Sequence, residues 1–303
     1  MMSTKRIYDL SVKICLCTAV FALYGWVLHD QSLAADKTDL VEIFDHGHIN
    51  WSKGLLFSRG MAAPPAKKQA KGPQAMEEAL ANARALALAN MQDIVLQTRV
   101  DSLNLVRDIA SSNDVMMAKV ESLVKGAKAV RQEYLSDGTV EVTMQMPIYG
   151  GFAQLVLPEE IKQIETIKTV SNENGASKNV LQESRSDIEA ETYTGIVVDA
   201  RGIQFAPSMA PVIVDEKSRE VYGSAFVSRE FAVQQGISGY SRDMQTAGQT
   251  PRVSGNPLMV KGLGTTENRA STIMISNADA SKIKSVSEHI SFLKKCRVMI
   301  VVD

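Results

Sequence analysis

Metal-ligand residue types gather in one short stretch of the sequence. Asp45, His46 and His48 stand within four positions, and two histidines two residues apart in a loop can both bind zinc. A zinc site needs about three or four protein ligands, however, and His289 is far away in the sequence. We therefore expect a structural or solvated role for these side chains and predict no metal-binding residue.

Cys296 is a candidate nucleophile, because a thiolate is reactive where positive charge surrounds it. Lys294, Lys295 and Arg297 supply such charge. The cysteine also stands just before the apolar run of residues 297–302, and a free cysteine that enters a core strand is more often buried. We predict a buried, inert thiol and no catalytic residue.

Asp199 follows an apolar run at residues 196–198, and a carboxylate at the end of a strand can be catalytic. No second carboxylate or nucleophile stands at a matched position, and Asp199 with Gly202 is also common turn chemistry. We predict a turn. An unrecognised hydrolase built around Asp199 or Cys296 is kept as an alternative.

Glycines cluster at residues 150–151 and 262–264. Neither place has the strand, glycine loop and helix of a phosphate cradle, nor its Lys-Ser/Thr ending. Both are predicted to be turns. The sequence therefore predicts no cofactor-binding residue and no cofactor.

Residues 1–35 have the three zones of a secretory signal peptide. Three basic residues up to position 13 precede an uncharged apolar run over residues 14–28, and small residues then allow cleavage after Ala34 or Ala35. An uncleaved anchor is the alternative, but the run is shorter than the roughly 20 residues of a spanning helix. No cysteine stands where a lipid is attached. We expect a cleaved Sec-type signal peptide and a periplasmic protein, which can also be associated with the outer membrane.

Composition limits what the exported chain can be. Two of the three cysteines lie in the signal segment, so Cys296 remains alone and no internal disulfide forms. Beyond residue 35 the chain carries 30 basic and 32 acidic residues, whereas a dedicated nucleic-acid binder would carry a basic excess. An apolar fraction of 45% is enough for a packed core, and no second apolar stretch has membrane length.

Helical periodicity is clearest over residues 74–99, which are strong helix formers with apolar residues at three- or four-residue steps. The many alanines favour a helix that lies close against a sheet. A second helix is predicted over residues 114–125, with Ser112 or Asn113 as its N-cap. A short polar helix is predicted over residues 159–167.

Strand signals occupy both halves of the chain. Residues 49–57 are predicted to form one apolar element, and residues 130–134 and 140–146 alternate in polarity around a turn, which predicts a hairpin. The second half is predicted to contain strands at 193–198, 211–214, 220–222, 258–260, 271–276 and 297–302, with a helix over 277–293 capped by Asn277 or Asp279.

These elements predict an α+β protein of two mixed α/β modules, each a small sheet covered by one or two helices, after a cleaved signal peptide. The predicted organisation is a signal peptide over 1–35, a first α/β domain over 36–168, a polar linker over 169–192 and a C-terminal α/β domain over 193–303.

Several features of residues 49–157 occur in a known order. They are Ile49-Asn50-Trp51, the Pro64-Pro65 loop, the alanine-rich helix with Ala79, Ala83, Arg84 and Ala87, the helix that ends near Gly126, and the run from Asp137 to Val142. This order resembles the LPP-twenty lipoprotein family and the related N-terminal domain of flagellar assembly protein T. The resemblance implies a small α/β module in structural or assembly factors of the envelope. Residues 194–302 resemble the second domain of uncharacterised exported proteins that carry the same first module.

We therefore expect a non-catalytic exported protein that acts through protein contacts in envelope or flagellar-type assembly. The expected partners are other envelope proteins or further copies of the chain, with peripheral membrane contact and no nucleic acid. A periplasmic module that binds a glycan or another small ligand is the alternative, and it predicts a deep pocket with aromatic lining.

Overall fold

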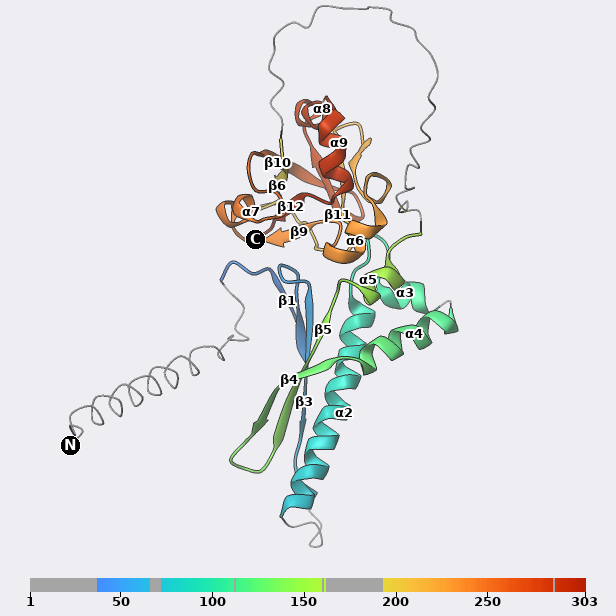
Figure 1. The fold of residues 1–303 in the computed structure, drawn as a ribbon, viewed down its shortest axis with the longest axis vertical. Coiled ribbons are helices and arrows are strands. Elements are labelled where there is room, and N and C mark those ends of the chain that lie inside the picture. Colours follow the sequence, from blue (N-terminus) through green and yellow to red (C-terminus); the bar gives the residue numbers. More distant parts are fainter. Residues whose placement is uncertain (1–36, 66–71, 112, 160, 162–192, 286) are drawn as a thin grey trace, which may run out of the picture. The chain divides into compact units, whose positions relative to one another are not determined.

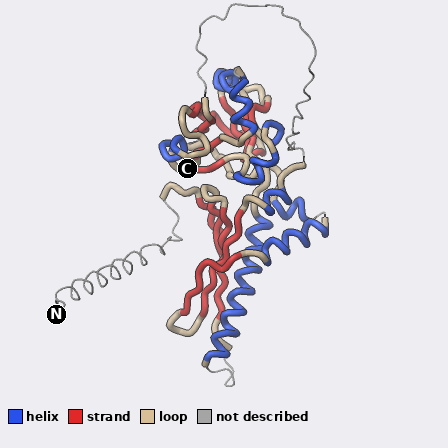
Figure 2. The backbone as a smooth tube through the Cα atoms, in the orientation of Figure 1, coloured by secondary structure: helices blue, strands red, loops and turns tan. Residues whose placement is uncertain are grey.

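The structure is a computed structural model of the 303-residue chain, and it describes residues 37–65, 72–111, 113–159, 161, 193–285 and 287–303. Two sheets and several helices make up these residues, which confirms the predicted α+β class (Figures 1 and 2). The predicted signal peptide, the linker and nearly all of the helix predicted over 159–167 lie outside the described residues.

Five antiparallel strands form the first sheet, in the order β1-β2-β3-β5-β4. They are β1 (Val41–Phe44), β2 (Gly47–Asn50), β3 (Leu55–Ala62), β4 (Lys128–Tyr134) and β5 (Val140–Pro147).

The hairpin predicted from the alternating residues is β4 and β5, which pair along their length. The single apolar element predicted over residues 49–57 is wrong. That stretch holds the end of β2 and the start of β3, with a turn between them in which Gly54 has φ 64°. Glycine reaches this left-handed region at little cost, so the chain reverses between Trp51 and the apolar residues Leu55 and Leu56.

Helix α2 (Pro73–Gln97) packs along one face of this sheet (Figure 1). The buried residues of the helix include a file of alanines, and Ser58 on β3 donates a 2.7 Å hydrogen bond to the Ala87 carbonyl. A Cβ atom at Gly60 would lie 2.2 Å from the Ala83 carbonyl oxygen. Small residues on both sides therefore set the short distance between helix and sheet, as the alanine content predicted.

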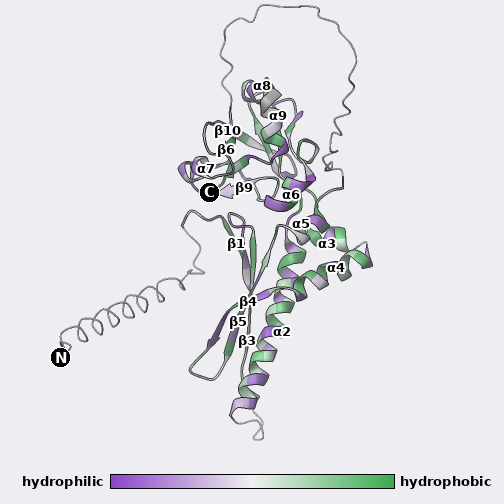
Figure 3. Ribbon diagram, viewed as in Figure 1, coloured by the Kyte–Doolittle hydropathy of each residue, from purple (hydrophilic) through white to green (hydrophobic). Residues whose placement is uncertain are grey.

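The described part of the first half also contains three shorter helices: α3 (Val106–Ala110), α4 (Asp114–Lys125) and α5 (Gly151–Val156). Helix α4 has the predicted bounds, and the Asn113 side chain caps it by accepting a hydrogen bond from the Met116 amide. In Figure 3 the helices and strands of this half carry both hydrophobic and hydrophilic residues, as expected of elements buried on one side.

The sheet face opposite α2 is not covered by any described helix or strand. Residues on β3 alternate, so that Leu56, Ser58 and Gly60 face the helix while Arg59 and Met61 face away. Met61 is 50% exposed and Ile43 on β1 is 75% exposed. We call this surface the open face.

Seven strands form the second sheet, in the order β8-β7-β11-β10-β6-β12-β9. They are β6 (Gly195–Asp199), β7 (Val212–Val214), β8 (Glu220–Tyr222), β9 (Gly239–Ser241), β10 (Pro257–Thr266), β11 (Arg269–Ile275) and β12 (Val298–Val301). The helices are α6 (Arg229–Gln235), α7 (Met244–Gln249), α8 (Asn277–Lys284) and α9 (Ser287–Lys294), with a 3₁₀ turn, η1 (Ser224–Phe226).

Strands β6 and β12 are parallel and have side chains buried on both faces of the sheet. Val197 and Met299 belong to the cluster under α7, whereas Ile196 and Ile300 belong to the main core. Because both faces of these strands are buried, their sequences are continuous apolar runs and do not alternate between apolar and polar residues.

The helix predicted over 277–293 is two helices, α8 and α9. Its predicted caps are also wrong, because Ser276 is the N-cap and its hydroxyl accepts a 3.0 Å hydrogen bond from the Asp279 amide. The Asp279 carboxylate in turn accepts from the Ser276 hydroxyl at 2.8 Å. The cap is one residue earlier than predicted because Ser276 was assigned to the preceding strand.

Residues 37–303 form one compact unit with a continuous main core. Segments far apart in sequence are joined by backbone hydrogen bonds: the Ala210 amide donates to the Val100 carbonyl at 2.7 Å, and the Gly150 amide donates to the Val233 carbonyl at 2.8 Å. None of the described helices combines the length and the apolar character that crossing a membrane requires.

Candidate functional site

The predicted metal-ligand stretch is divided between a turn and a sheet face. Asp45 and His46 form the turn between β1 and β2, whereas the His48 ring stacks on Phe57 with 4.6 Å between ring centroids. Burial is the main cause that lowers the pKa of His48. Among the described residues, no three His, Cys, Asp or Glu side chains are placed to hold a metal ion. The side chain of His289 lies outside the described part of the chain.

The Cys296 thiol is buried, as the sequence predicted. The residue follows α9 with φ 55°, and burial raises the pKa of its thiol to about 12. A thiol of this kind is almost entirely protonated near neutral pH, and only the thiolate is a good nucleophile. The three basic neighbours in the sequence do not overcome the cost of burying the charged form.

Asp199 ends β6 and is held by Arg201. Two hydrogen bonds of 2.8 Å join the guanidinium to the two carboxylate oxygens, and the first cause of the lowered Asp199 pKa is this contact. Gly202 follows with φ 75°. The arrangement is the predicted turn, braced by a bidentate ion pair, and the carboxylate oxygens are already engaged.

The two glycine clusters differ. Gly150 has φ 74° and stands immediately before α5, which agrees with the predicted turn. The turn predicted at residues 262–264 is wrong, because Gly262 and Gly264 lie inside β10 at an irregularity in its pairing with β11. A Cβ atom at Gly262 would lie 3.0 Å from the Asp199 carbonyl oxygen, so a close approach of two strands accounts for this glycine.

A polar cavity of about 400 Å³ lies beside β9 and α7. Two tyrosines, Tyr149 and Tyr240, and one arginine, Arg252, contribute to its wall. Its other polar groups are mostly hydroxyls and amides, from Thr38, Ser52, Gln234, Gln235, Ser241, Thr246 and Thr250. A volume of this size and a lining of this kind suit a small polar ligand.

The ring of Tyr149 is positioned by two glycines. A Cβ atom would lie 2.2 Å from the Tyr149 ring at Gly54 and 2.5 Å from it at Gly236. Both glycines have positive φ, 64° in the turn before β3 and 82° at the end of α6. Two distant turns thus leave just the space that the aromatic ring occupies.

Among the described residues, the hydrogen bonds donated by the Arg252 guanidinium all go to backbone carbonyl groups, and it forms no ion pair. Its guanidinium donates to the carbonyls of Cys296 at 2.7 Å and Gly236 at 3.2 Å, and it also donates to the Gln235 carbonyl. The carboxylate at the same cavity, Asp39, is paired with Lys53 at 2.8 Å. The cavity wall therefore offers Arg252 as a cationic group that an anionic ligand can neutralise.

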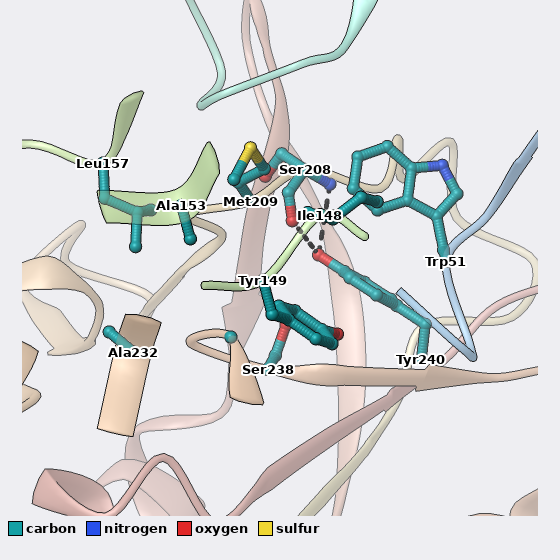
Figure 4. Close-up of a pocket in the computed structure, with 11 residues that line it drawn as sticks. Trp51, Ile148, Tyr149, Ala153, Leu157, Ser208, Met209, Ala232, Ser238 and Tyr240 are labelled. Carbon is teal, nitrogen blue, oxygen red and sulfur yellow. Dashed lines mark hydrogen bonds between the residues drawn. The ribbon is translucent and has the colours of Figure 1, made fainter. Parts of the chain in front are cut away.

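A second cavity, shown in Figure 4, adjoins the first through the shared residues Tyr149 and Tyr240. The Tyr240 hydroxyl donates to the Ser208 carbonyl at 2.7 Å and accepts from the Ser208 amide at 3.1 Å (Figure 4). Trp51 packs edge-on against Tyr240, with 5.8 Å between ring centroids. The space enclosed is about 10 Å³, which is room for about one water molecule. It is packing space rather than a ligand site.

Sequence reasoning did not find Arg252. The residue stands in a loop with no motif around it, and its neighbours at Gln235 and Cys296 are far away in the chain. Tyr149 directly precedes the two glycines at 150–151, and no motif in the sequence marks it as a ligand-binding residue. The signal that identifies both residues is their convergence in the fold.

The comparison with protein families corrects the resemblance stated above. The family whose model matches is described as Treponema pallidum Tp0624, second domain, and not as LPP-twenty or flagellar assembly protein T. The features that suggested those families, an alanine-rich helix against a sheet and an Asp-Gly hairpin turn, are general solutions of helix-on-sheet packing. The chain matches no curated protein. Residues 195–303, which hold the whole second sheet from β6 to β12, are thus similar to the second domain of Treponema pallidum Tp0624.

Proposed function

We propose that the protein is an exported, non-catalytic component of a cell envelope that acts through contacts with other envelope proteins. The observation that carries this proposal is the open face of the first sheet. It leaves Ile43 and Met61 exposed to solvent, and the half-buried His48 ring lies on the same face, stacked on the buried Phe57 ring. Exposed apolar groups grouped with polar ones are typical of contact surfaces between proteins.

The chemistry of the candidate catalytic groups also supports a contact role. The Cys296 thiol is buried with a raised pKa, and the Asp199 carboxylate is held by Arg201. The proposal of export depends on the signal pattern in residues 1–35. The flagellar form of the expectation depended on the corrected resemblance and is not part of this proposal.

Site-specific photo-crosslinking in the native host tests the proposal. A photoreactive phenylalanine analogue at Ile43 or Met61 should give a discrete adduct with an envelope protein. Leu86 is the matched control, because it is an apolar residue 48% exposed on α2. Adducts that are equally abundant from Leu86, or none from either open-face position, would contradict the contact function.

A second candidate function is the binding of a small anionic ligand in the polar cavity. The observation that favours it is Arg252, a guanidinium without an ion pair among the described residues, at the wall of a space of about 400 Å³. Tyr149 and Tyr240 at this wall also support the candidate, because a periplasmic binding module is expected to have an aromatic lining.

Calorimetric titration with galacturonate, a sugar acid that carries one carboxylate, tests this candidate. Binding should be at least tenfold weaker in Arg252→Lys, which keeps the charge but loses the planar fork. Arg242→Lys is the control for a general charge or stability effect, because the Arg242 side chain is outside the cavity lining. Equal affinity of the two variants, or no heat with the unaltered protein, removes this candidate ligand class.

A further inference from the structure

Strand β4 forms one edge of the first sheet and is exposed on both of its faces. Helix α2 packs on β3 and β5, and β4 extends beyond it. Three apolar residues at this edge are exposed, Val130 at 37%, Tyr134 at 53% and Leu135 at 40%. An edge strand of this kind presents unpaired backbone groups to which another strand can add.

The hydrogen-bond pattern shows which backbone groups at this edge have no partner among the described residues. The Leu135 amide donates to the Thr139 carbonyl across the hairpin at 2.8 Å. Antiparallel strands alternate, so residues 131, 133 and 135 direct their backbone groups to β5, and residues 132 and 134 direct theirs outward. A partner strand would therefore hydrogen-bond to Gln132 and Tyr134.

The side chains of β4 are complementary to a second copy of the same strand. If two β4 strands pair antiparallel about a twofold axis at Gln132, Arg131 of each copy faces Glu133 of the other. The same register places Val130 opposite Tyr134, an aromatic and β-branched pair of the kind that stabilises sheets. Arg131 and Glu133 both lie on the open-face side, because they pair with Thr143 and Glu141 on β5.

Charge selects this register over its neighbours. A twofold axis at Arg131 would place two arginines opposite each other, and an axis at Glu133 would place two glutamates opposite each other, which is unfavourable. Within one copy Glu133 already lies opposite Glu141, and Arg131 is its ion-pair partner, at 2.6 Å. Arg131 of the second copy would add a positive charge beside these two carboxylates.

We propose that the protein forms a symmetric homodimer through antiparallel pairing of two β4 strands, with Arg131 of each copy paired to Glu133 of the other. This inference rests on the proposed contact function, because it names a second copy of the chain as one partner. The surface involved is the β4 edge and not the open face. The bulge near Val130 limits the paired segment to a few residues. An interface this short is in the class of weak, reversible contacts.

A charge-exchange experiment on the full chain tests the pairing by analytical ultracentrifugation over a range of concentrations. The unaltered protein should dimerise, with a dissociation constant in the micromolar range. Arg131→Glu alone and Glu133→Arg alone should each sediment as monomers, since each homodimer would hold two like-charge pairs. An equimolar mixture of the two variants should recover a dimer, because every facing pair is then opposite in charge.

The matched controls are Arg269→Glu and Glu267→Arg, an exposed pair with the same spacing in the β10–β11 hairpin. These should leave the dimer unchanged. Thermal unfolding of each β4 variant should match that of the unaltered protein, because the two side chains are 56% and 40% exposed. A protein that stays monomeric at millimolar concentration, or a dimer that survives both single variants, overturns the pairing. Loss of the open-face adducts with the dimer intact would instead remove only the proposed contact with other envelope proteins.

Discussion

At the scale of single residues, burial decides the chemistry of this protein more than charge in the sequence does. Cys296 has three basic neighbours along the chain, yet the pKa of its thiol is raised because the fold buries it. Asp199 shows the opposite case, in which a hydrogen-bonded guanidinium lowers the pKa of a carboxylate that solvent partly reaches. Neither environment activates a nucleophile or a base near neutral pH.

Cys296 should therefore react slowly with thiol reagents. With a pKa of about 12, its thiolate fraction at pH 8 is roughly a thousandfold below that of an ordinary cysteine. In a background with Cys15→Ser and Cys17→Ser, we expect labelling by a disulfide reagent to be at least about 100-fold slower than in denaturant. Labelling at equal rates in the folded and unfolded chain would contradict the buried position.

Deprotonation of the buried Tyr240 should lower the free energy of unfolding at alkaline pH. Burial raises the pKa of Tyr240 to about 12, above its value of about 10 in an unfolded chain. The neutral phenol is thus favoured in the folded state, so its contribution is complete below pH 10 and is lost as the pH rises towards 12.

Denaturant unfolding from pH 8 to pH 12, followed by circular dichroism, measures this loss. The Tyr240→Phe variant should lose about 1–3 kcal/mol at pH 8, because the Ser208 amide and carbonyl lose their partner. That variant should also show a smaller decline above pH 10. An identical decline in both proteins would exclude Tyr240 as a contributor.

At the scale of elements, the close packing of α2 on the first sheet is the main determinant of the structure of residues 37–159. The alanines of the helix and Gly60 of β3 leave no room for larger groups, since a Cβ atom at Gly60 would meet backbone atoms of α2 at 2.2 and 2.3 Å. A backbone atom cannot move aside as a flexible side chain can, so helix and sheet would have to separate.

Gly60→Ala should lower the free energy of unfolding by about 2–4 kcal/mol, the cost of overpacking a rigid contact. Gly264→Ala is the matched control, because Gly264 also lies in a strand and a Cβ atom there meets nothing within 4 Å. We expect the control to change stability by less than about 1 kcal/mol in denaturant unfolding. Equal effects of the two substitutions would show that the packing distance is not limiting.

At the scale of the whole molecule, residues 37–303 form one compact unit whose main core includes side chains from both sheets. The proposed contacts use two surfaces of the described residues, the open face and the β4 edge, and a cavity lies beside Arg252. A protein that acts through contacts needs such surfaces on a rigid support, and the continuous core provides that support.

Export is the property of the whole chain on which the proposed location depends. The mature protein isolated from its native host should begin at Ala35 or Asp36 and appear in the envelope fraction, because small residues precede those positions. Amino-terminal sequencing and fractionation measure this. A natural protein that begins at Met1 in the cytosol would contradict both export and the envelope partners.

The sequence alone determined the elements whose signals are local. The α2 and α4 helices, the β4–β5 hairpin and most strands of the second half follow from periodicity, capping and turn residues that act within a few positions of the chain. The buried state of Cys296 was also predicted correctly, because the apolar run after it belongs to a core strand.

Only the tertiary structure decided what depends on distant residues. The space that Gly54 and Gly236 leave for Tyr149 and the carbonyl partners of Arg252 both join segments that are separate in sequence. The same is true of the open face, because an exposed side chain such as Met61 differs from a buried one only by what the rest of the chain places over it. Local propensity carries no information about these long-range contacts, and the packing of the whole chain fixes them.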